Sequence, residues 1–265
     1  MNEYRKKVKR EKIKLVTIQL LLLAFLVLGW EFLVRGGILN EFLVSKPSSI
    51  FKLFLTYLEE GNLLGHIKIS VYETLLGLLI GTGLGIVIAI GLWWNKFIAK
   101  VLDPFLVVLN ALPKTALAPI LIIWVGLGIK GIVVVAISLS IVVTIMSSYN
   151  YFKSVDEEKV KMLKTFGATK YQILTKLVLP SNIPNLINVL KINIGMSWVG
   201  VIVGEFLVSR EGIGYLVVYG GQVFRLDLVM MGVIVLAIIA LVMYLVVNFL
   251  EKYFISSEYC FLLSP

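Results

Sequence analysis

The residue types that most often carry covalent catalysis are sparse in this chain. It has one histidine, His66, and one cysteine, Cys260, and its apolar runs contain no cluster of His, Cys or carboxylate side chains. No Gly-x-x-x-x-Gly-Lys-Ser/Thr phosphate loop occurs, so the usual cradle for nucleotide phosphates is missing. A membrane enzyme is therefore disfavoured. We predict no catalytic residue, no metal site and no cofactor bound by this chain, and we interpret His66 as a surface residue.

Charged and polar side chains inside long apolar runs suggest a different chemistry, the passage of a solute. Lys191 and Glu205 lie in one such run, and on a helix they fall with Trp198 within about a third of the circumference. A charge facing lipid would cost several kcal/mol, so both should face protein or water, or reach toward the helix ends. Two interpretations stay open, a structural pairing or snorkelling and a place on a transport path.

A second polar segment interrupts another apolar run. Between Asn110 and Pro119 the chain has two prolines, Pro113 and Pro119, and the lysine Lys114. Each proline removes a backbone donor and frees a carbonyl, which is tolerated in a membrane only where the backbone is buried in protein or lines a watery cavity. Lys114 could attract an anionic solute or satisfy the freed carbonyls. The residues that we assign to a candidate translocation path are Asn110, Pro113, Lys114, Thr115, Lys191, Trp198 and Glu205.

Small residues recur at helical spacing in two apolar runs. Gly77, Gly81 and Gly85 follow one another every four residues, and Gly200 and Gly204 repeat the spacing later in the chain. Membrane helices associate through close packing at such residues, because lipid tails are as apolar as leucine. We predict these five glycines as helix-packing positions. The alternative is glycine scattered at its ordinary frequency in membrane helices.

Composition indicates that the elements carrying these residues span a bilayer. Apolar residues make up 59% of the 265 residues and charged residues 15%, which would leave a soluble globule with too little polar surface. A spanning helix needs roughly 20 mostly apolar residues. We predict an all-α polytopic membrane protein of about six transmembrane helices. The candidate spans are 15–34, 71–93, 105–125, 132–149, 187–207 and 228–250.

The basic residues predict which side of the membrane each end occupies. With both termini in the cytoplasm, sixteen Lys and Arg residues face inward and seven face outward, as the positive-inside rule expects. The net charge of +9 therefore reads as a topology signal and not as a nucleic-acid surface. The first run could also be a cleaved signal, but it is long for a signal core and lacks a small-x-small site. We divide the chain into a basic cytoplasmic N-terminus (1–14), a transmembrane domain (15–250) and a cytoplasmic tail (251–265).

Two segments between spans have helical patterns of their own. Ile50 to Leu58 is amphipathic and predicts an interfacial helix on the outer face. The inward loop 152–180 reads as helix, break, helix, ended by a proline, with Gly167 turning the chain at the break. Val160, Leu163 and Phe166 recur at helical spacing before the break, and such an apolar face invites the groove of a partner protein. Alternatively, the face lies against the inner leaflet or the helical bundle.

The loop resembles the cytoplasmic signature of ABC importer permeases, which is Glu-Ala-Ala, three residues, Gly, nine residues, Ile, one residue, Leu-Pro. Gly167, Leu179 and Pro180 fall on its fixed positions, and Leu177 takes the place of the isoleucine. The Glu-Ala-Ala element is absent, because Lys161-Met162-Leu163 occupies it. The resemblance implies an ATPase-coupling set of Lys161, Met162, Leu163, Phe166, Gly167, Ala168, Leu179 and Pro180.

Two further segments are similar to permeases of the nitrate, sulfonate and taurine importer class. They are Pro113–Pro119 with Trp124, Gly126 and Gly128 after it, and Trp198–Glu205 followed by Gly212-Ile213-Gly214-Tyr215. With the loop between them, the resemblance covers roughly residues 45–250. It implies the MetI-like fold of type I ABC importer permeases, with a coupling helix in the cytoplasmic loop.

The resemblance also implies partners and a role. Two copies of the permease would pair as a homodimer in the cell membrane, dock two cytoplasmic ATPase subunits that bind ATP and Mg²⁺, and receive solute from an extracytoplasmic binding protein. The implied solute is small and anionic, like a sulfonate, taurine or nitrate; the alternative is a vitamin precursor of the thiamine-pyrimidine or riboflavin type. A secondary transporter driven by an ion gradient is a weaker alternative, because the two halves show no repeat.

Overall fold

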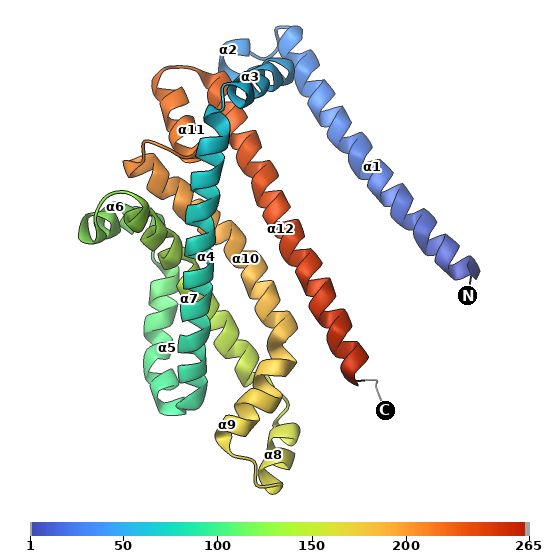
Figure 1. Cartoon of the computed structure of the whole chain (residues 1–265), viewed down its shortest axis with the longest axis vertical. Coiled ribbons are helices and arrows are strands. Elements are labelled where there is room, and N and C mark those ends of the chain that lie inside the picture. Colours follow the sequence, from blue (N-terminus) through green and yellow to red (C-terminus); the bar gives the residue numbers. More distant parts are fainter. Residues whose placement is uncertain (1, 263–265) are drawn as a thin grey trace. The chain divides into compact units, whose positions relative to one another are not determined.

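All the regular secondary structure in the part of the chain that the structure describes is helical (Figure 1). The computed structural model describes residues 2–262, and five of their helices are long and apolar enough to cross a membrane, or up to six spans if the bent pair α5 and α6 counts as one. The prediction of an all-α polytopic protein is thereby confirmed. The elements are α1 Asn2–Arg35, α2 Glu41–Val44, α3 Pro47–Glu59, α4 Asn62–Trp94, α5 Lys96–Ala111, α6 Lys114–Val125, α7 Ile129–Lys153, α8 Glu157–Thr165, α9 Lys170–Ile173, the π-helical segment η1 Leu174–Val178, α10 Leu179–Val208, α11 Ile213–Gln222 and α12 Leu226–Leu262.

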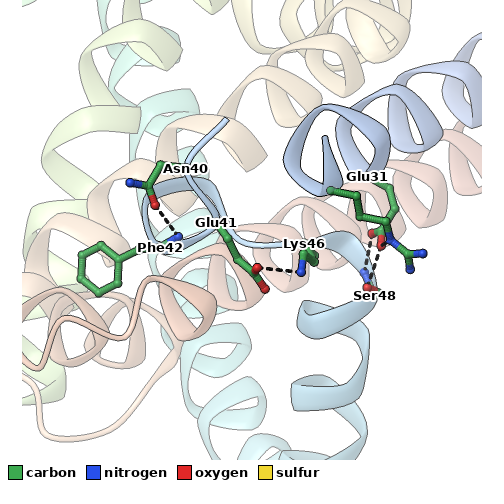
Figure 2. A network of polar contacts seen from close by, with 7 residues as sticks. Glu31, Asn40, Glu41, Phe42, Lys46 and Ser48 are labelled. Carbon is green, nitrogen blue, oxygen red and sulfur yellow. Dashed lines mark hydrogen bonds and ion pairs between the residues drawn. The ribbon is translucent and has the colours of Figure 1, made fainter. Parts of the chain in front are cut away.

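The chain divides into two compact units, and the smaller one contains the predicted interfacial helix. This unit comprises Met1–Leu64 and Leu216–Ile234. Here α3 is fastened to α1 by Glu31, whose carboxylate accepts hydrogen bonds from the backbone N–H of Ser48 (3.1 Å) and from its hydroxyl (2.9 Å), as Figure 2 shows. Arg35 donates to the same carboxylate at 2.6 Å. Because Ser48 lies in the first turn of α3, Glu31 supplies the anionic cap that the helix's own preceding residue, Lys46, does not provide.

The larger unit, Gly65–Tyr215 with Val235–Pro265, is built around α7. Helix α4 approaches α7 along its glycines: a methyl group added to Gly77 would lie 2.6 Å from Cβ of Ala136, and one added to Gly85 would lie 2.5 Å from Cβ of Thr144. Gly81, between them, faces Ser140 in the same way. Since any side chain at these three positions would collide with α7, the two helices pack at backbone distance.

Helix α10 packs on α7 along a second glycine track. A methyl group at Gly200 would collide with the backbone of Ala136, and one at Gly204 would lie 3.0 Å from Cα of Ile132. Ala136 is fully buried, and a single small residue of α7 therefore receives both α4 and α10. The five glycines singled out in the sequence all lie at these two crossings.

The predicted third span, 105–125, is not a single helix, which corrects that expectation. Helix α5 begins earlier, at Lys96, and ends at Ala111, and α6 starts at Lys114 after a bend of 98°. Leu112, the residue before Pro113, adopts an extended conformation with ψ 138°, because the proline ring disfavours a helical residue before it. Neither helix alone reaches the length of a span, with 16 and 12 residues respectively.

The loop 152–180 also differs from its prediction at its end. Pro180 was expected to end the second helix of the loop, but α9, η1 and α10 follow one another without a break from Lys170 to Val208. The π turn η1 precedes Pro180 and widens the backbone where its ring would clash with the carbonyl of Lys176. The predicted tail, 251–265, is helical to Leu262, and residues 263–265 lie outside the described part.

Candidate functional site

The short helix α8 in the loop 152–180 has sequence signals for both of its ends. Asp156 precedes the helix, and its side chain accepts a hydrogen bond from the backbone N–H of Glu158 at 2.9 Å. Glu157 and Glu158 occupy the first turn and Lys164 the last turn, as the helix dipole favours. The N-cap and these charges therefore stabilise both ends of the helix, which at nine residues is too short to be stable by itself.

The turn after α8 is a complete Schellman motif centred on Gly167. The N–H of Ala168 donates to the carbonyl of Leu163 at 3.0 Å and that of Gly167 to the carbonyl of Lys164 at 2.9 Å, while Gly167 has a φ of +77°. Helix α9 then starts with a capping box between Thr169 and Gln172. The chain reverses here with its terminal backbone groups satisfied, so the segment from α8 to α9, Glu157 to Ile173, has a well-defined turn, and we call this segment the elbow.

The apolar residues of α8 divide between two directions. Val160, Leu163 and the following Ala168 pack on a buried cluster that includes Phe152 of α7 and Ile173 of α9. Phe166, predicted to share that face, instead has an exposed fraction of 80%, and Met162, one turn before it, is 53% exposed. The packed residues fit the alternative of a face lying against the bundle. The exposed pair Met162 and Phe166, with Lys161 beside it, remains free for a partner.

The second half of the elbow is tied to the end of α4. The Lys170 ammonium group donates a hydrogen bond to the carbonyl of Trp94 and lies 5.3 Å and 5.8 Å from the ring centroids of Trp94 and Trp93. Leu179 packs on the same buried cluster as Leu163, and Pro180 continues into α10. A displacement of the elbow would therefore reach both α4 and α10.

The polar segment of the bent pair has a structural contact of its own. Lys114 donates a hydrogen bond from Nζ to the carbonyl of Asn110 at 3.1 Å, one of the last carbonyls of α5. This contact is the carbonyl-satisfying role that the sequence left open. Asn110, Pro113 and Thr115 are exposed on the single chain, and the inner side of α6 packs on α7 through Ala118 and Ile122.

Lys191 of α10 is held by α12. Its ammonium group lies 2.5 Å from the Glu251 carboxylate and 3.1 Å from Oδ1 of Asn248, and it stands 5.7 Å from the centroid of the Tyr244 ring. Trp198 on the same side of α10 is buried among apolar residues of α4 and α12. Lys191 and Trp198, two of the residues predicted for the translocation path, therefore make their contacts within the chain.

Glu205 is buried, with 1% of its surface exposed, and it joins a polar cluster that the sequence did not indicate as one site. Its partners are Ser70 of α4, whose hydroxyl donates at 2.5 Å, and the backbone N–H of Gly214 in α11, also at 2.5 Å. Glu73 of α4 contacts it and is equally buried. His66 is half-buried here and accepts a hydrogen bond from the N–H of Gly212 at 2.9 Å, a contact within the chain that the sequence did not indicate.

The signal for Glu73 was present in the spacing. It precedes Gly77 by four residues and so lies on the side of α4 that the glycines turn toward α7. Among the described residues, no group of three or more His, Cys, Asp or Glu side chains could hold a metal ion.

Comparison with known proteins identifies the family of this chain. Residues 81–257 match the family model of the binding-protein-dependent transport system inner membrane component. The chain belongs to this family. It is a multi-pass membrane protein and a permease subunit of an ABC importer, as the resemblance of its loop 152–180 and of the two further segments implied.

Curated relatives of this permease carry several substrate names. It is 29% identical to SsuC of Bacillus subtilis, named as an aliphatic sulfonates transport permease, over 88% of this chain and 84% of that protein. It is 24% identical to the taurine transport permease TauC of Escherichia coli, over 89% and 88%. It is 30% identical to the formylaminopyrimidine transport permease ThiX of Halalkalibacterium halodurans, over 72% and 75%.

Solved structures show the same fold at low sequence identity. A chain of the MetNI methionine ABC transporter matches with a TM-score of 0.61 at 15% identity, over 75% of this permease and 97% of that chain. A chain of a bacterial transporter that imports the polysaccharide alginate matches with a TM-score of 0.66 at 16% identity, over 94% and 98%. The MetI-like fold predicted from the loop is thereby confirmed.

Proposed function

We propose that this permease pairs with a second copy of itself and couples solute passage to two cytoplasmic ATPase subunits docked on α8. The observation that carries the proposal is the exposed pair Met162 and Phe166 on an elbow whose turn is hydrogen-bonded. Large apolar side chains exposed on a charged loop are typical of a contact with another protein. Nucleotide-driven closure of the ATPases would push the elbow, and Lys170 and Leu179 would pass the movement to α4 and α10.

The extracytoplasmic side and the solute belong to the same proposal. A binding protein delivers a small anion of the sulfonate or taurine type, a choice supported by the names of SsuC and TauC. The second candidate is a pyrimidine vitamin precursor, which the match to ThiX favours. Both termini would lie in the cytoplasm, because the basic residues then gather inside.

Copurification tests the docking surface. The tagged permease, extracted from its native membrane, should bring down an ATPase subunit, and the double variant Met162→Ser with Phe166→Ser should lose it while the permease still inserts. Phe224→Ser is the matched control, because Phe224 is 72% exposed on the predicted outer side. Equal recovery of the ATPase with the double variant would remove α8 from the proposal. Uptake of labelled taurine against labelled formylaminopyrimidine distinguishes the two solutes.

A further inference from the structure

Two glutamates from different helices lie together in the interior of the larger unit. Glu73 of α4 and Glu205 of α10 are each 1% exposed and in contact with each other. Taking an ionised carboxylate out of water costs several kcal/mol unless it is paired or richly hydrogen-bonded, and two ionised carboxylates side by side also repel. No ion pair of the described residues includes either glutamate. The site therefore requires another way to limit its negative charge.

Glu205 has the surroundings of an ionised carboxylate. The Ser70 hydroxyl donates to Oε1 at 2.5 Å, the N–H of Gly214 donates to Oε2 at 2.5 Å, and the N–H of Tyr215 adds a further hydrogen bond. Gly214 and Tyr215 lie in the first turn of α11, where the helix dipole favours an anion. A carboxylate that accepts several such bonds is stabilised in its charged form.

Glu73 has contrasting surroundings. Its Oε2 is buried and has no hydrogen-bond partner in the described part of the chain. An ionised Glu73 would leave this oxygen unpaired beside the negative Glu205, whereas a protonated Glu73 can donate its O–H to the Glu205 carboxylate. The side chains of Glu73 and Glu205 lie within hydrogen-bonding reach of each other, as this assignment requires.

The other titratable groups at this site do not supply a compensating positive charge. His66 of α4 accepts the Gly212 N–H through Nδ1, so this nitrogen carries no proton and the imidazole is neutral. Tyr215 of α11 stacks on His66 with ring centroids 6.0 Å apart, and Glu211, in the segment before α11, is itself acidic and exposed. Lys68 and Arg210, the basic residues nearest in sequence to these side chains, are exposed, and so is Lys130 at the start of α7.

We propose that Glu73 and Glu205 form a buried proton-binding site that holds one proton, carried by Glu73, and that fastens the start of α11 to α4 and α10. The ligand is a proton and not a metal ion, because the described residues offer only these two carboxylates at the site and no group of three ligands. The hydrogen-bonded pair joins three helices: Glu73 and Ser70 come from α4, Glu205 comes from α10, and Gly214 comes from α11.

Infrared difference spectroscopy of the purified wild-type transporter tests the proton directly. At neutral pH we expect the carbonyl stretching band of a protonated carboxylic acid, and this band should disappear in Glu73→Gln. Glu59→Gln, at the exposed end of α3, is the matched control and should leave the band unchanged. A wild-type spectrum without such a band, or a band that survives in Glu73→Gln, would overturn the proposal.

Thermal unfolding of two variants supplies a second and independent test. Glu73→Gln should keep the wild-type unfolding midpoint, because the amide N–H can replace the carboxylic O–H as donor to Glu205. Glu205→Gln should lower the midpoint, because its NH₂ group would face the N–H donors of α11. If Glu73→Gln lowered the midpoint as much as Glu205→Gln, both residues would be acting as carboxylates and the single-proton assignment would fail. Neither measurement depends on the solute or on ATPase docking.

Discussion

Some buried polar residues of this permease form hydrogen bonds between neighbouring helices. Asn193 of α10 donates from Nδ2 to the hydroxyls of Thr82 in α4 at 2.8 Å and of Thr144 in α7 at 2.6 Å. All three side chains are buried. Since lipid offers no hydrogen bonds, such contacts specify which face of each helix turns inward.

Replacement of Asn193 should therefore weaken the three-helix contact. We expect Asn193→Ala to lower the free energy of unfolding by about 1 kcal/mol, the range found for polar contacts between membrane helices. Denaturation of the purified protein in detergent micelles measures this change. Asn188→Ala is the control, because Asn188 is exposed on the same helix. Equal losses for the two variants would mean that the hydrogen bonds of Asn193 contribute nothing beyond helix propensity.

Lys114 allows a test between transport and structural roles. If its charge attracts an anionic solute, Lys114→Met should raise the KM for uptake by roughly fivefold, which corresponds to a lost contact of about 1 kcal/mol. Lys100→Met removes an exposed lysine of α5 and should leave KM unchanged. Normal uptake by Lys114→Met, with reduced thermal stability, would assign the residue to its bond with the Asn110 carbonyl.

At the scale of elements, the sequence predicted helices better than their continuity. Five of the six long apolar runs correctly located helices long enough to cross a membrane, and Gly167 correctly located the turn of the elbow, because span length and glycine stereochemistry are local properties. The 98° bend at Leu112 and the uninterrupted passage through Pro180 were not predicted. The bend depends on which partners the backbone groups freed by Pro113 find, and the continuous helix depends on the π turn that keeps the ring of Pro180 from a clash. Residue spacing along the chain reveals neither.

The turn at Gly167 depends on backbone conformation and not on space. No atom lies within 4 Å of a Cβ placed there, but its φ of +77° costs other L-residues about 1–2 kcal/mol. Gly167→Val should therefore distort the elbow and reduce ATPase copurification, whereas Gly167→Asn should retain it, because asparagine tolerates this conformation. Copurification of the ATPase subunit with each variant is the measurement. Full recovery with valine would show that docking does not need the turn.

The glycine track of α4 depends on space and not on conformation. A Cβ at Gly81 would collide with Ser140 of α7, while one at Gly83, half a turn away, would meet nothing within 4 Å. Gly81→Leu should thus force α4 and α7 apart and destabilise the protein by about 3 kcal/mol or more, seen as a lower thermal midpoint or loss of the monodisperse peak in size-exclusion chromatography. Gly83→Leu should behave like the wild type. The opposite order would mean that α4 turns a different face toward α7.

At the scale of the whole molecule, the surroundings of each helix determine which of its side chains must pack within the chain, because lipid cannot hydrogen-bond polar groups. The most buried candidate span among the described residues is α7, with 56% of an apolar 18-residue stretch buried, which agrees with its contacts to both glycine tracks. The sequence predicted those tracks but not their common neighbour Ala136, because a small residue on the receiving helix has no periodic signature of its own. The exposed Asn110 and Thr115 have their expected function only if a second copy or a lipid-free cavity covers them.

The orientation of the chain in the membrane is a prediction about the molecule as a whole. In a Cys260→Ser background, which removes the native thiol, the cysteine introduced by Glu60→Cys should react with a membrane-impermeant thiol reagent in intact cells. The cysteine introduced by Thr165→Cys, at the end of α8, should react only after permeabilisation, because the distribution of basic residues predicts that this loop lies in the cytoplasm. Glu60 and Thr165 are both exposed, so burial would not explain a missing label. The reverse pattern would place α8 on the outer face, where no ATP-hydrolysing subunit could reach Met162 and Phe166.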